Sequence, residues 1–99
     1  MKVYEGKRNG TAADVTVDGR PLNPRRDLWN HSPSGFEWGY SGSGPAQLAL
    51  AILADCLGDD EAWEWYQDFN ASVVAGLPYA GWTLTEEAIL ETITTFAVK

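Results

Sequence analysis

Lysine and arginine are scarce in most of this 99-residue sequence, and residues 27–98 contain neither. The first 26 residues hold six basic and three acidic side chains, whereas residues 27–99 hold eleven acids and one lysine. The balances of +3 and −10 give the net charge of −7. Proteins that stack on single-stranded nucleic acid normally combine their aromatics with a basic groove. We therefore expect no direct binding to nucleic acid.

Cysteine, histidine and long apolar runs are also scarce. The single cysteine, Cys56, cannot form an internal disulfide. One cysteine and one histidine are too few for a zinc site, so we expect no metal and no cofactor. The longest apolar segment, residues 45–57, is interrupted by Gln47 and Asp55 and is shorter than the roughly 18 residues of a bilayer span. The first residues lack the apolar core of a secretory signal. These absences predict a soluble cytoplasmic protein without membrane contact.

The sequence does contain enough apolar and aromatic side chains for one core. Hydrophobic residues make up 44% of the chain, with five Trp, four Tyr and three Phe. A chain of this size buries well over half of its unfolded surface, and each aromatic contributes a large area. We predict a single domain over residues 1–99.

The first 40 residues show the patterns of strands and turns. Residues 2–5 and 14–17 alternate in the strand period, and the Asn9-Gly10 pair between them favours a hairpin turn. Residues 20–35 contain three prolines, which predicts a loop. The alternating aromatics of residues 36–40 predict a short third strand.

Three helices are predicted after this region. The segment 45–57 is apolar nearly all round and follows a Gly-rich stretch, so it predicts a central buried helix. Gly58 ends it, and a second helix with one apolar face follows. A loop around Pro78 leads to a capping box at residues 83–86 and a third helix. The residues expected to face the core are Ala62, Tyr66, Phe69, Val73, Leu77, Ile89, Ile93 and Phe96. The predicted fold class is α+β: a small N-terminal antiparallel sheet of about three strands, then three helices.

The run FEWGYSGSGPAQLALAIL at residues 36–53 resembles a family of small uncharacterised bacterial, archaeal and phage proteins known as a domain of unknown function. The similarity extends through VTVDGRPLNPR, NHSPSGFEWGY, YQDF followed by VV, and GWTLT, in order along the chain. It implies a shared fold and an occurrence in phage and mobile-element genomes. It supplies no activity and no catalytic residue. The WEW run at residues 63–65 and the lack of a lysine near Phe69 depart from the family pattern.

Two short motifs have weak catalytic or binding alternatives. The run Gly42-Ser43-Gly44 before a helix could cradle a phosphate, but no Walker lysine follows, and close packing explains the glycines better. Asp27, His31 and Ser32 supply the residue types of a hydrolase triad, yet their spacing on a Pro-rich loop gives no convergent geometry. We therefore expect that the protein is not an enzyme.

Acids on the second and third helices, with two tryptophans, form the candidate partner-binding set. Glu61, Glu64 and Asp68 are three or four residues apart and share one helix face, where each like-charged pair costs a few tenths of a kcal/mol. Neighbours at this spacing lie roughly 5 to 6 Å apart, a scale comparable to successive phosphates along a strand. The set comprises Asp59, Asp60, Glu61, Trp63, Glu64, Trp65, Asp68, Glu87 and Glu91.

Two explanations of this acidic surface stay open. One is that net negative charge serves only solubility, and the other is that the carboxylates engage a basic partner. Our leading hypothesis is a small acidic, non-enzymatic binding protein that engages a basic nucleic-acid-binding protein by charge and by nucleic-acid mimicry. A phage-type inhibitor of the anti-CRISPR kind, acting in the host cytoplasm, fits this description.

Other functions remain as alternatives. A small-ligand or nucleotide-binding module could form where the Pro-rich loop meets the Gly-rich helix start, with His31, Glu37, Tyr40 and Ser43 as its residues. Self-association through apolar surface near Trp63 or Trp82 is a third possibility. We expect a monomer or a weak homodimer.

Overall fold

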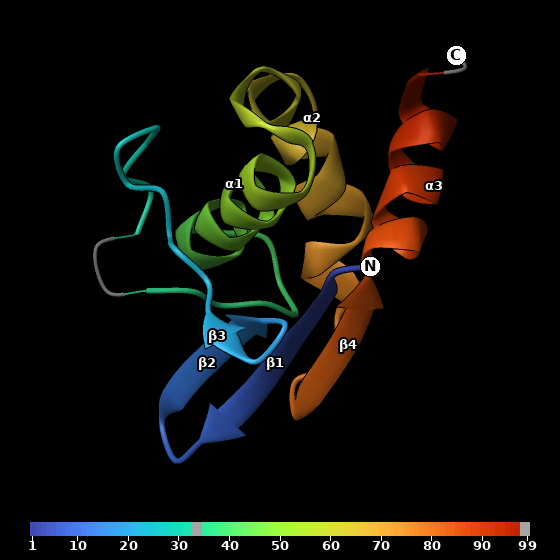
Figure 1. The fold of residues 1–99 in the computed structure, drawn as a ribbon. Helices are drawn as coiled ribbons and strands as arrows, with labels where there is room; N and C mark the ends of the chain where they lie inside the picture. Colours follow the sequence, from blue (N-terminus) through green and yellow to red (C-terminus); the bar gives the residue numbers. More distant parts are fainter. Residues whose placement is uncertain (33–34, 98–99) are drawn as a thin grey trace.

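The fold is an antiparallel four-stranded sheet with helices on one side (Figure 1). The computed structural model describes residues 1–32 and 35–97. The strands β1 (Val3–Asn9), β2 (Ala12–Val17), β3 (Arg20–Pro21) and β4 (Gly81–Thr85) lie in the order β3-β2-β1-β4. The helices are α1 (Ser43–Leu57), α2 (Asp59–Ser72) and α3 (Glu86–Ala97), with a 3-10 turn η1 (Val74–Gly76) after α2. The α+β class predicted from the sequence is confirmed.

The N-terminal hairpin forms as predicted. Asn9 is paired with Ala12 at the end of the β1–β2 ladder, and Gly10 has a φ of 66°, the left-handed conformation that such a turn needs. A second tight turn at Asp18 and Gly19, with φ of 50° and 81°, leads into β3. The Asp18 side chain accepts a hydrogen bond from the Val3 amide at 2.9 Å, which ties this turn to the start of β1.

The position of the third strand was predicted wrongly. Residues 36–40, predicted as a strand, form none. The fully buried Trp38 is anchored by its indole N–H, which donates to the carbonyls of Pro78 and Tyr79, and Gly39 then turns the chain with a φ of 88°. The sheet is completed by β3, inside the predicted Pro-rich loop, and by β4, where a loop and a capping box were predicted. Long-range pairing of β4 with β1 decides the outcome.

The close contact between β4 and β1 requires a glycine. Gly6 is the cross-strand partner of Trp82, and a Cβ added at Gly6 would lie 2.3 Å from the indole Nε1. The Trp82 ring therefore covers the backbone of β1, and it packs edge-on against Trp38 with ring centroids 5.6 Å apart. Trp82 is buried, so it offers little apolar surface for self-association.

Helix α1 is the centre of the core, as predicted. It begins at Ser43, two residues earlier than expected, and is buried continuously from Gly44 to Ala54. Gly44 lies against Glu37, since a Cβ on Gly44 would be 2.7 Å from the Glu37 Cβ. Close packing therefore accounts for Gly44, as the sequence suggested. In Figure 1, α1 lies between the loop that precedes it and α2.

The two later helices bury the predicted apolar faces. Ala62, Tyr66 and Phe69 on α2 are buried, whereas Val73 and Leu77 are half-buried and follow the end of the helix at Ser72. On α3 the buried residues are Ile89, Ile93 and Phe96. Helix α3 starts later than the predicted capping box, because the Thr85 hydroxyl, and not Thr83, accepts the hydrogen bond from the Ala88 amide at 3.1 Å. Within the described residues, none of the helices is long and apolar enough to span a bilayer.

Candidate functional site

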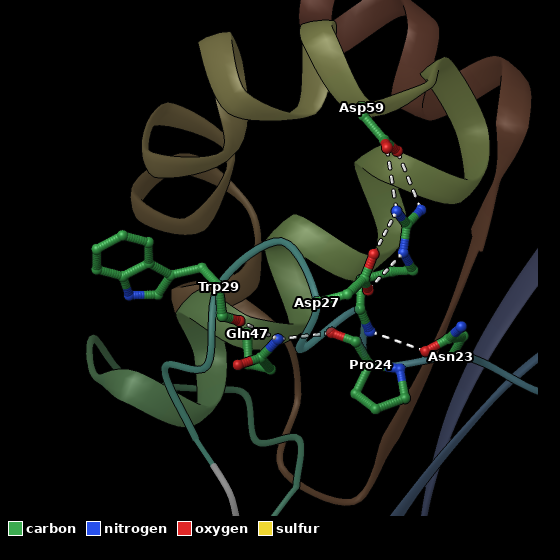
Figure 2. Close-up of polar contacts among 7 residues, drawn as sticks. Asn23, Pro24, Asp27, Trp29, Gln47 and Asp59 are labelled. Atoms are coloured by element: carbon green, nitrogen blue, oxygen red, sulfur yellow. Dashed lines mark hydrogen bonds and ion pairs between the residues drawn. The ribbon is translucent and has the colours of Figure 1, made fainter.

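The loop before α1 is fixed by one buried glutamine. Gln47 is fully buried on α1, and its Oε1 accepts hydrogen bonds from the amides of His31 at 2.7 Å and Ser32 at 3.1 Å. Its Nε2 donates to the carbonyls of Pro24 and Trp29 (Figure 2). An amide side chain has two donor hydrogens and one oxygen that can accept twice, so Gln47 is fully satisfied. It holds the backbone of residues 24–32 on α1.

The same loop is joined to α2 by an arginine. The Arg25 guanidinium makes two 3.0 Å hydrogen bonds to the carboxylate of Asp27 and two more, also at 3.0 Å, to that of Asp59 at the start of α2. Both carboxylates turn toward this group in Figure 2. The guanidinium lowers the pKa of Asp27 through these hydrogen bonds. Asp59, one of the predicted partner-binding residues, is therefore engaged within the fold.

Four rings from the loop and from α2 form an aromatic patch, which we define as Trp29, His31, Trp63 and Tyr66. The ring centroids of Trp29 and Trp63 are 5.9 Å apart with planes at 88°, and those of Trp63 and Tyr66 are 5.8 Å apart. The His31 Nε2 lies 3.0 Å from the Tyr66 hydroxyl. Trp29 and Trp63 remain 53% and 42% exposed, so the patch presents two indoles to solvent.

Sequence reasoning included Trp63 but missed Trp29. The two residues are distant in the sequence, and Trp29 lies in a Pro-rich loop with no periodic pattern around it. The one available signal was a large aromatic in a polar loop. Only the folded loop, held by Gln47, brings Trp29 to the flank of α2.

The other predicted tryptophan, Trp65, has a different environment. It is half-buried and stacks on Phe96 of α3, with centroids 6.1 Å apart and an interplanar angle of 30°. Trp63 and Trp65 thus lie on opposite flanks of α2, as their spacing of two residues requires at about 100° per residue. Trp65 holds α3, and Trp63 meets the loop.

Six of the predicted acids are exposed and make no ion pair with the described residues. They are Asp60, Glu61, Glu64 and Asp68 on α2, and Glu87 and Glu91 on α3. The acids that do form ion pairs in residues 1–32 and 35–97 are Asp27, Glu37, Asp55 and Asp59. Ion pairing therefore distinguishes these four carboxylates from the six others, although Asp27 and Asp59 are also exposed.

The exposed acids lie in two separate places. Glu87 and Glu91 line a groove along α3 that also contains the exposed apolar side chains of Met1 and Leu90. Asp60 and Glu61 belong to a shallow hollow at the start of α2. The two hollows share no residue, so the acids do not all contribute to one concave site.

The four residues of the alternative ligand site do not share contacts with one another. His31 turns to Tyr66 of α2, whereas Glu37 binds the Arg8 guanidinium through Oε2 and Nη1 at 3.0 Å. Tyr40 is 51% exposed, and Ser43 is exposed at the first turn of α1. Burial lowers the pKa of His31, which keeps its ring neutral at pH 7.

Arg8 is the internal partner of two aromatics. Its guanidinium carbon lies 4.3 Å from the ring centroid of Trp38 and 4.1 Å from that of Tyr79. The Arg8 Nε donates to the Tyr79 carbonyl at 3.0 Å. Arg8 in turn lowers the pKa of Glu37 through their hydrogen bond. Glu37 is thus part of a structural cluster that connects β1 to the segment before α1.

The residues of other candidate chemistries do not converge. Asp27 binds Arg25 and the His31 Nε2 lies 3.0 Å from the Tyr66 hydroxyl, so the acid and the base of such a triad are each engaged by another residue. Burial raises the pKa of the Cys56 thiol, which disfavours the thiolate. Among the described residues, no group of three His, Cys, Asp or Glu side chains is placed to hold a metal ion.

Comparison with known proteins gives a family and no function. No curated protein and no solved structure matches the chain. A family model described as a family of unknown function, DUF6166, matches residues 4–95. This match includes β1 from its second residue, the other three strands and nearly all of α3. The chain belongs to DUF6166, a family of unknown function.

Proposed function

We propose that this protein is a non-enzymatic binding protein that engages a basic partner through an acidic stripe on α2, defined as Glu61, Glu64 and Asp68. The observation that carries the proposal is the division of the acids described above. Four other carboxylates are paired with arginine or lysine, whereas the acidic stripe is exposed and forms no ion pair with a described residue.

The cost of the acidic stripe supports a use beyond folding. Its members are like charges at i+3 and i+4, each pair destabilising by a few tenths of a kcal/mol. They lie opposite the buried face of α2, so no core contact requires them. A basic partner would relieve this repulsion, and the opposite charges would accelerate the encounter.

The partner that fits this surface is a nucleic-acid-binding protein. Such proteins carry basic surfaces that neutralise phosphates. Helical neighbours at i+3 and i+4 have Cβ atoms roughly 5 to 6 Å apart, a scale comparable to that of successive phosphates on a strand. Occupation of such a surface would exclude nucleic acid, which is the action of a phage-type inhibitor of a CRISPR effector or of a similar complex.

Competition with DNA tests this proposal. The domain is mixed with purified basic DNA-binding proteins, including CRISPR effectors, and DNA binding by each is measured by fluorescence anisotropy. We expect the domain to displace DNA from at least one of them, and the triple variant Glu61→Lys, Glu64→Lys, Asp68→Lys to lose this effect. Unchanged DNA binding by every protein, or equal displacement by the triple variant, would reject the proposal.

A further inference from the structure

Two exposed tryptophans from different elements lie together at the aromatic patch. Trp29 comes from the loop before α1, and Trp63 comes from α2. Their rings are nearly perpendicular at 5.9 Å, and about half of each side chain is open to solvent. A large aromatic ring that stays exposed contributes little of the free energy that its burial in a core would provide. Adjacent exposed indoles on a small domain therefore suggest a contact surface.

The position of Trp29 is set before any partner arrives. Gln47 holds its carbonyl at 3.0 Å, and the Arg25–Asp59 ion pair ties the loop to the first turn of α2. The contact between His31 and Tyr66 adds a third connection between this loop and α2. Because this backbone is already fixed, binding at Trp29 costs little further loop entropy. The scaffold thus presents both indoles as a preformed pair.

The charge around this pair favours a cation. Asp60 lies one turn before Trp63 on α2, Glu64 follows Trp63 directly, and both are exposed. The faces of indole rings carry partial negative charge, so they attract cations in the same way as the carboxylates do. On the loop that carries Trp29, the Arg25 guanidinium is already bound by Asp27 and Asp59, and residues 27–98 contain no lysine or arginine.

The chain itself shows how aromatic rings and a carboxylate hold an arginine. Arg8 lies over both Trp38 and Tyr79 and binds Glu37. The planar guanidinium suits this arrangement because it stacks on rings and hydrogen-bonds carboxylates at the same time. The aromatic patch with Asp60 and Glu64 offers the same chemical groups at the surface.

We propose that Trp29 and Trp63 receive an arginine side chain of the basic partner, with Asp60 and Glu64 as the neighbouring carboxylates. This inference rests on the proposed function, because it assigns the residues that hold one cation of that partner. It adds a position-specific contact to the general attraction exerted by the acidic stripe.

A peptide titration monitored by NMR tests the inference. The probe is a nine-residue peptide of alternating arginine and serine, and the matched control peptide carries citrulline, which keeps the size and planarity of arginine without its charge. We expect the indole N–H signals of Trp29 and Trp63 to shift with the arginine peptide and to stay still with the citrulline peptide. The buried indole of Trp38 serves as an internal reference.

Leucine variants separate this contact from the rest of the surface. Trp29→Leu and Trp63→Leu should each weaken peptide binding about two- to fivefold, as expected for an exposed cation–π contact. Tyr40→Leu, which removes an exposed aromatic outside the aromatic patch, should leave the affinity unchanged. An unchanged Trp38 signal shows that each variant is folded.

Two results would overturn the inference, and they differ in what they say of the proposed function. If the amides of the acidic stripe shift while both indoles stay still and the leucine variants bind as the wild type does, the arginine contact is wrong and the proposed function stands. If neither the acidic stripe nor the indoles respond to the arginine peptide, both are wrong.

Discussion

The two flanks of α2 carry one tryptophan each and are held by different forces. On one flank Trp63 meets a loop fixed by Gln47 and Arg25, mainly through polar contacts. On the other flank Trp65 stacks on Phe96, and apolar side chains hold α3. The apolar flank closes the core, whereas the polar flank leaves aromatic surface open. The comparison shows that hydrogen bonds to the backbone can fix the position of an exposed side chain such as Trp29. Apolar packing fixes a side chain by burying it.

Removal of the Gln47 amide should break the polar flank and give the largest effect. Gln47→Leu keeps most of the volume but leaves two carbonyls and two amides without their partner. Each buried unsatisfied group costs about 1–3 kcal/mol, and since opening of the loop to water limits the total, we expect a loss of about 3 kcal/mol. Urea denaturation measures this loss. Wild-type stability in the variant would contradict the role of Gln47.

Truncation of Phe96 should affect the apolar flank alone. Phe96→Ala removes a buried ring that stacks on Trp65 near the end of α3. We expect a loss of about 2 kcal/mol, below the roughly 3–5 kcal/mol that is usual for such truncations, because a helix end can adjust. The indole signal of Trp29 should stay in place. A shift of that signal would show that the two flanks are coupled.

Acid should weaken the fold through Glu37. Arg8 lowers the pKa of Glu37 from its ordinary value of 4.5. Because the folded-state pKa is the lower one, this carboxylate stabilises the fold above about pH 4.5, and its contribution is lost as the pH falls through the folded-state pKa. The free energy of unfolding, measured from pH 6 to pH 3, should therefore fall less steeply in Glu37→Gln.

The difference between Glu37→Gln and the wild type should stay below about 1 kcal/mol, because solvent screens a partly exposed pair. Asp27, whose pKa is also lowered, is present in both proteins, so its contribution cancels. Parallel pH profiles for the two proteins would contradict the assigned Arg8–Glu37 interaction.

The smallest change in stability is expected for Trp29→Leu. The side chain is half exposed and its backbone contacts with Gln47 are kept, so the free energy of unfolding should change by less than about 0.5 kcal/mol. Trp65→Leu, the matched change on the other flank, should cost more because Trp65 packs on Phe96. Equal losses from the two variants would remove the distinction between the flanks.

Local patterns were sufficient for the helices and the hairpin. The largely apolar segment 45–57 predicted the buried helix α1. The Asn9-Gly10 pair predicted the hairpin, although its turn consists of Gly10 and Thr11 and Asn9 is still part of β1. The prediction of a third strand at residues 36–40 was wrong. These residues alternate in the strand period, but Trp38 is anchored outside the sheet. The partner of β1 is instead β4, a pairing between distant segments that no local pattern reveals.

The candidate site was predicted only in part, for a similar reason. Helical spacing placed the acidic stripe on the outside of α2 and the two tryptophans on its opposite flanks, but it did not indicate which tryptophan is exposed. It gave no information on Asp59, which is paired with Arg25 from the loop, or on Trp29. Gln47 looked like an interruption of an apolar helix, whereas the structure makes it the residue that fixes the loop. The periodicity of a segment predicts which of its faces is buried, but it does not predict which distant segment contacts that face.

The most direct test of the proposed function compares two variants of equal net charge. Glu64→Lys with Asp68→Lys reverses two members of the acidic stripe, and Glu5→Lys with Asp14→Lys reverses two acids of the sheet. The measurement is the dissociation constant of each variant for a basic partner identified by DNA competition. We predict that the α2 variant binds at least about tenfold more weakly than the sheet variant, which corresponds to about 1.4 kcal/mol. Equal affinities would show that only the net charge matters and would contradict the proposed function.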